Sequence, residues 1–101
     1  MRLELIPRDE GDAVDEDAWR ERLLQEGFDV CRWRDEAGAD YPPHSHDHDE
    51  SLWIVEGEMV FSAAGRELRL RAGDRLMLPK GTVHTARAGG DGVTYLIGER
   101  P

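Results

Sequence analysis

The sequence predicts one all-β domain with a single short helix near its N-terminus. Three observations support this class: short segments with alternating apolar residues recur from residue 28 onward, clusters of Gly, Pro and Asp separate them, and only one segment has helical features. The chain has 101 residues, of which 39% are hydrophobic and 35% are charged. This composition supports one modest core, and the chain is too short for two domains. We therefore expect a β-sandwich or barrel.

Residues 1–37 are expected to form an extension packed on the barrel, with an edge strand, a helix and one further strand. The helix is predicted from Asp15 to Gln25, because acidic residues occupy its first turn and Gly27 follows its end. The predicted apolar face consists of Val14, Ala18, Trp19 and Leu23. A helix of about three turns is marginal alone, so we expect this face to lie against the barrel.

Eight short strands are predicted after the helix. They are Phe28 to Trp33, His44 to His46, Glu50 to Val55, Glu58 to Ser62, Arg66 to Leu70, Arg75 to Leu78, His84 to Ala88 and Val93 to Ile97. Residues 63–65 are expected to form a tight hairpin, and the glycine-rich segment 89–92 a looser one. Strand alternation points one set of aliphatic side chains into the barrel. That set is Leu52, Ile54, Leu68, Leu70, Leu76 and Leu78.

The charge of the chain argues against nucleic acid and membrane partners. There are 13 Lys and Arg against 22 Asp and Glu, which gives a formal net charge of -9, and an acidic protein repels phosphate backbones and anionic lipids. No apolar run approaches the roughly 20 residues of a membrane span. The N-terminal segment does not resemble a signal peptide, so a cytoplasmic location is expected. The single Cys31 excludes an internal disulfide and is expected to be a small apolar filler.

A histidine-rich stretch, His-Ser-His-Asp-His-Asp-Glu, carries the clearest chemical signal. Residues two apart in a strand project from the same face, so His44 and His46 point to one side, and Glu50 can join them after a short connection. Two imidazoles and a carboxylate that converge in this way indicate a divalent metal site. His84 is a fourth candidate, because Pro79 rigidifies the turn that leads into its strand.

Other interpretations of this stretch stay open on the residues alone. A segment rich in His and Asp can be a solvated metal-scavenging loop, and four histidines in this chain can be incidental. A binuclear metallohydrolase motif of the His-x-His-x-Asp-His type fits poorly, because positions 48 and 49 hold His and Asp in the reverse order. His48 is expected in the turn between His46 and Glu50, as a solvated residue or, alternatively, as a proton-transfer group.

Two spaced patterns resemble the signature motifs of the cupin superfamily. They are Gly38-x5-His44-x-His46-x3-Glu50-x6-Gly57 and Gly73-x5-Pro79-x-Gly81-x2-His84. Nine of the ten signature positions match, and Ala88 stands where the pattern has Asn. The resemblance covers residues 38–88 and implies a cupin-type jelly-roll barrel with its core over 38–101. It also implies that one divalent ion is held by His44, His46, Glu50 and His84.

The resemblance implies a small metal-dependent enzyme, a dioxygenase, isomerase or decarboxylase, acting on a small oxygenated substrate. The alternative is a non-catalytic domain that binds or senses a metal or small ligand. Three imidazoles and a carboxylate suit Fe, Mn, Ni, Co, Cu or Zn and do not select among them. The remaining acid–base candidates are His48, Tyr41, Tyr95 and Lys80, with a core or rim position as the plainer interpretation of Tyr95.

The sequence also predicts a homodimer. An open-ended jelly roll has exposed strand edges, and three tryptophans exceed what a core of this size requires. The alternative is that the helix over residues 15–25 shields those edges within one chain. Trp53 is out of phase with Glu50, so it is expected to face outward, either under the N-terminal segment or in the dimer contact.

Overall fold

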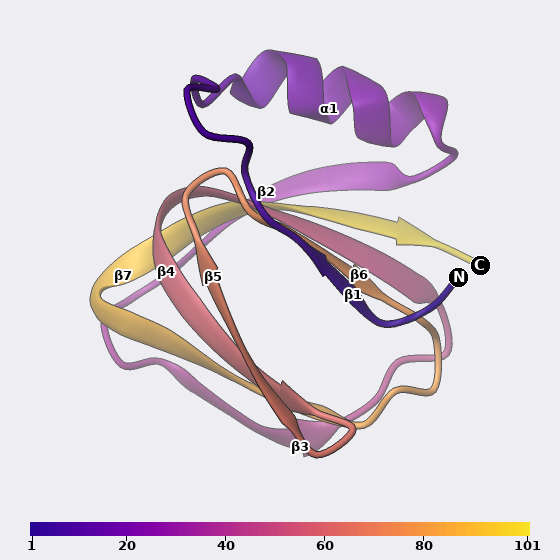
Figure 1. Ribbon diagram of the computed structural model, residues 1–101. Helices are drawn as coiled ribbons and strands as arrows, with labels where there is room; N and C mark the ends of the chain where they lie inside the picture. Colours follow the sequence, from indigo (N-terminus) through magenta and orange to yellow (C-terminus); the bar gives the residue numbers. More distant parts are fainter.

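Seven strands form a barrel covered at one side by one helix in the computed structural model, which describes residues 1–101 (Figure 1). The elements are β1 (Glu4–Ile6), α1 (Glu16–Gln25), β2 (Asp29–Asp35), β3 (Asp40–His44), β4 (Asp49–Ala63), β5 (Arg66–Arg71), β6 (Arg75–Leu78) and β7 (His84–Arg100). The all-β class with one short N-terminal helix is confirmed. No helix in the structure has the length and apolar character that crossing a membrane requires.

The two longest strands, β4 and β7, pair antiparallel along their length and run through both layers of the barrel. The first part of β4 pairs with β6, and its last part, residues 58–63, pairs with β5. The beginning of β7 pairs with β3, and its end pairs with β2. One layer therefore has the order β1-β6-β4-β7-β2, and the other has β5-β4-β7-β3. Figure 1 shows β4 and β7 curving together around the barrel.

Two predicted breaks in the strands are wrong. The segments predicted over 50–55 and 58–62 are one strand, β4, and those predicted over 84–88 and 93–97 are one strand, β7. The looser hairpin expected at 89–92 does not form. Gly57 has a φ of +84°, and the register of β4 against β7 shifts on both sides of it. A glycine at such a bulge bends a strand while pairing continues beyond it, and its sequence signal resembles that of a turn.

Replacing Gly57 by Ala should destabilise the barrel strongly. A Cβ at this position would lie 2.2 Å from the carbonyl oxygen of Gly92, in addition to the strain of a positive φ. Gly65 is the matched control, because it has a φ of +73° with nothing within 4 Å of an added Cβ. We expect a loss in unfolding free energy of about 3 kcal/mol for Gly57→Ala and about 1 kcal/mol for Gly65→Ala. Urea unfolding measures both, and equal losses would contradict the close approach.

The main core fills the space between the two layers. All six aliphatic residues predicted to point inward are buried in it, so that prediction is confirmed. The other buried members are Met59, Phe61, Ala86, Ala88, Val93 and Tyr95. The tight hairpin between β4 and β5 is also confirmed, with positive φ at Ala64 and Gly65. Ala88, where the cupin pattern has Asn, is an apolar side chain in an apolar environment.

The helix α1 contacts the barrel through one side only. Leu23 is fully buried, and the ring of Trp19 stacks on that of Trp53 with centroids 5.0 Å apart and 7° between the planes. Trp53 therefore lies under the N-terminal segment, which is one of the two positions predicted for it. Val14 and Ala18, also assigned to the apolar face, are exposed. Val14 precedes the helix, which begins after the N-cap residue Asp15.

Candidate metal centre

Three histidines converge at one end of the barrel. His44 ends β3, His84 begins β7, and these two residues are partners in the strand pairing. His46 follows in the connection to β4. One ring nitrogen from each histidine lies within 4.8 Å of the others. The sequence placed His44 and His46 within one strand, but β3 ends at His44, so His46 reaches the cluster from a loop.

Two of these imidazoles are oriented by backbone carbonyl groups. The Nδ1 atom of His44 lies 2.7 Å from the oxygen of Pro42, and that of His84 lies 2.9 Å from the oxygen of Thr82. A carbonyl oxygen only accepts, so in the neutral imidazole each Nδ1 carries the proton and each Nε2 keeps a free lone pair. Metal-binding histidines usually make this kind of contact with the nitrogen that does not bind the metal. Burial also lowers the pKa of His84, which favours the neutral form that binds metals.

Glu50 is 7% exposed, and its carboxylate lies beside the cluster. Its Oε2 atom is 3.6 Å from Nε2 of His46 and 2.9 Å from Nε2 of His48. His46, His48 and Glu50 thus form a second close group, which shares His46 with the first. The four residues assigned to the metal from the sequence are brought into one region, with His48 next to them.

His48 lies in the connection between β3 and β4, as the sequence predicted, and it contacts Glu50 as well as solvent. Its side chain is 27% exposed, and the hydrogen bond to Glu50 raises the pKa of its imidazole. A solvated turn residue would make no such contact. Because His48 donates to Oε2, the Oε1 atom of Glu50 is left for another partner, and the bond fixes the orientation of the carboxylate.

The cluster opens into a cavity of about 370 Å³, small for a ligand pocket. Its walls are His44, His46, Glu50 and His84 together with Cys31, Trp33, Tyr41, Leu52, Met59, Phe61, Ala86, Tyr95, Ile97 and Glu99. Of the six aliphatic residues predicted to line the barrel, only Leu52 reaches this cavity. Cys31 is exposed on the edge strand β2, so its assignment as a small apolar filler is wrong. Lys80, an acid–base candidate, is exposed outside this cavity.

Asp35, at the end of β2, organises a polar group that the sequence did not reveal. It is 6% exposed, and its carboxylate accepts hydrogen bonds from Trp33 Nε1 at 3.0 Å, Tyr41 OH at 2.6 Å and Tyr95 OH at 2.7 Å. The bond to Asp35 raises the pKa of Tyr41, and burial together with the same carboxylate raises the pKa of Tyr95. Tyr95 lies far from Asp35 in the sequence, so no local pattern marks this group.

Comparison with known proteins agrees with this architecture. The family model for the cupin domain matches residues 31–97. The protein YdbB of Bacillus subtilis is 41% identical over 52 residues, which cover 50% of this chain and 46% of YdbB. The chain spans less than half the length of the curated relatives it matches.

Solved structures show the same fold. KdgF from Halomonas sp. is 29% identical with a TM-score of 0.60, and the match covers 71% of this chain and 68% of that one. Protein NMB1881 from Neisseria meningitidis is 26% identical with a TM-score of 0.64, over 99% of this chain and 84% of that one. The family match extends over most of the chain and includes all four histidines and Glu50. The chain therefore belongs to the cupin family.

Proposed function

We propose that this cupin binds one divalent transition-metal ion through His44, His46, Glu50 and His84 and acts enzymatically on a small oxygenated molecule. The observation that carries the proposal is the convergence of three imidazoles at the wall of a pocket, two of them with Nδ1 hydrogen-bonded to a backbone carbonyl. The bound ion would supply Lewis acidity or, for iron and manganese, redox chemistry. Glu50 completes the donor set, and His48 holds its carboxylate in place.

One observation favours the alternative of a non-catalytic binding domain. General acid–base catalysis needs a group that exchanges its proton near neutral pH. The phenol protons of Tyr41 and Tyr95 are donated to Asp35, and the pKa of each tyrosine is raised. These two candidates are therefore poor proton-transfer groups, which leaves His48 as the remaining member of the predicted set near the cluster.

Substrate conversion distinguishes the two functions. We would load the protein with Fe(II) or Mn(II), offer a panel of small diketones and phenols, and follow both oxygen uptake and the proton NMR spectrum of each compound. Oxygen uptake reports a dioxygenase, and the spectrum reports isomerisation or decarboxylation. The enzyme proposal expects conversion of at least one compound, which His46→Ala abolishes. Metal-loaded protein that leaves every compound unchanged would favour the binding domain.

Metal binding should stabilise the fold, because the proposed ligands come from separate elements and meet only in the folded chain. At a free-ion concentration about 100 times the dissociation constant, linkage gives roughly 2.7 kcal/mol. For a domain of this size, that corresponds to a rise in Tm of roughly 10 to 20 °C. Thermal unfolding with and without chelator measures the shift, and His46→Ala is the control that should show none. A native Tm that is unchanged by removal of bound metal would contradict the proposal.

The homodimer stays a prediction, and the exposed edge of the barrel supports it. The strand β2 pairs only with β7, most of its residues are exposed, and Trp33 on it is 50% exposed. Edge strands of this kind are usually covered in native proteins. Sedimentation at micromolar concentration should give about twice the chain mass of 11.4 kDa, and a value near 11.4 kDa would reject the dimer.

A further inference from the structure

The wall of the pocket formed by Trp33, Tyr41 and Tyr95 has an unusual hydrogen-bonding character. All three side chains line the cavity, whereas Asp35, which receives their hydrogen bonds, does not. The three donor side chains therefore stand between the carboxylate of Asp35 and the cavity. Its three partners are neutral groups.

These bonds determine what the wall can offer a ligand. A phenol has one proton, and an indole has one N–H. Tyr41, Tyr95 and Trp33 all direct these protons at Asp35. The two phenol oxygens are then acceptors only, so a ligand hydroxyl can donate to them, whereas a ligand carboxylate or carbonyl oxygen would face lone pairs.

The charges around the cavity also disfavour an anionic ligand. Glu50 and Glu99 line it, and no Arg or Lys does. An anionic group buried against this wall would have no cationic partner, and burial of an unpaired charge is costly. Met59, Phe61 and Ile97 also line the cavity. Their hydrocarbon surfaces suit a ligand with an apolar middle, placed between the metal cluster and the tyrosines.

We propose that the pocket selects an uncharged small molecule with a hydroxyl group that donates a hydrogen bond to the phenol oxygen of Tyr41 or Tyr95, and that it discriminates against an anionic group at that position. Asp35 is the positioning residue, because it holds both phenols as acceptors. The inference rests on the proposed function, because the ligand it describes is the small oxygenated molecule that is proposed to bind beside the metal.

Three probes that share a catechol ring test this selectivity. They are 4-(hydroxymethyl)catechol, 4-methylcatechol and 3,4-dihydroxybenzoate, which differ only in a hydroxyl donor, a methyl group or a carboxylate. Calorimetric titrations would use the full chain, both loaded with Zn²⁺ and metal-free. We expect the hydroxymethyl compound to bind about tenfold more tightly than the methyl compound, as one hydrogen bond allows, and the carboxylate to bind most weakly.

The variants Tyr41→Phe and Tyr95→Phe identify the accepting oxygen. The variant that removes it is expected to weaken binding of the hydroxymethyl compound about five- to tenfold and to change binding of the methyl compound less than twofold. If the tyrosines had a structural role alone, their replacement would weaken the binding of both probes equally. Because Tyr95 is buried and its variant can lose stability, circular dichroism checks its folding, and the more exposed Tyr41 gives a second test.

Several outcomes would overturn the inference: equal affinity of native protein for the hydroxymethyl and methyl compounds, tightest binding of the carboxylate, equal weakening of both probes in the tyrosine variants, or no binding of any probe. The Zn²⁺ stoichiometry in the same titrations tests the proposed function separately. Bound zinc without probe selectivity contradicts the inference alone. Absence of zinc binding contradicts the metal site. In that case, the order of the three probe affinities in metal-free protein still tests the inference.

Discussion

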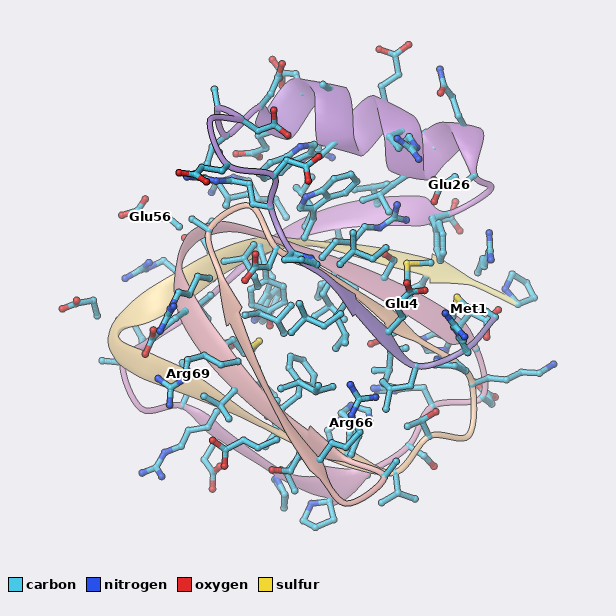
Figure 2. All side chains as sticks on the ribbon, viewed as in Figure 1. Met1, Glu4, Glu26, Glu56, Arg66 and Arg69 are labelled. Carbon is cyan, nitrogen blue, oxygen red and sulfur yellow. The ribbon has the colours of Figure 1, made fainter.

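Replacing Glu26 by Ala should lower the free energy of unfolding by about 3 kcal/mol, because it leaves a buried charge without its counterion. Arg75 is 5% exposed, and its guanidinium donates to both carboxylate oxygens of Glu26, at 2.5 and 3.3 Å. Arg75 also donates to Ser51 Oγ at 2.8 Å and lies over the ring of Trp53. Glu26 lies just beyond the last turn of α1, facing the barrel (Figure 2). The pair thus attaches the helix to the barrel.

Urea unfolding of the native protein and the variant measures this loss. The control is Glu21→Ala, which removes an exposed glutamate from the same helix and should change stability by less than about 0.5 kcal/mol. If Glu26→Ala were as mild as the control, Arg75 would have to find solvent or another partner, and its assigned role in docking the helix would be wrong.

The same pair predicts a pH dependence. Hydrogen bonds from Arg75 lower the pKa of Glu26 below its ordinary value of 4.5. The unfolded chain then binds the proton more readily than the folded one, so stability falls with decreasing pH. The contribution of Glu26 is fully present above about pH 4.5 and is lost as the pH falls through the lower folded value. The stability difference between native protein and Glu26→Ala should therefore shrink in acid.

His46→Ala should abolish stoichiometric metal binding, whereas His48→Ala should retain it. His46 belongs to both close groups of potential ligands, so its loss removes a donor from either. His48 contacts the cluster through Glu50, and loss of a residue that orients a ligand typically weakens metal affinity about 10- to 100-fold. Calorimetric titration with Zn²⁺ gives stoichiometry and affinity for both variants. Equal loss of binding in both, with equal folding by circular dichroism, would overturn the ligand assignment.

The spacing of a few residues was enough to predict the fold and the region of the site. Alternation in β5 identified the buried Leu68 and Leu70, and the acids before Trp19, with Gly27 beyond the end, marked the helix. The spacing from His44 to Glu50 and the turn before His84 marked side chains that the structure brings together. Each of these signals is local, because it depends on residues within one strand, helix or turn.

The features that the sequence did not reveal depend on tertiary contacts. Gly57 could end a strand or bend it, and only the pairing of β4 with β7 on both sides distinguishes the two. Asp35 gains its role from Tyr95, a residue 60 positions away. Cys31 has the small apolar side chain of a core filler, but it lies on an edge strand where most residues are exposed.

The most direct test of the metal site is the NMR spectrum of the imidazole nitrogens during titration with diamagnetic Zn²⁺. The chain has four histidines, so each can be assigned individually in long-range proton–nitrogen correlations. The proposed site predicts that the Nε2 signals of His44, His46 and His84 move to metal-bound positions at one equivalent, while His48 stays metal-free. A spectrum in which His48 binds zinc and His44 and His84 do not would contradict it.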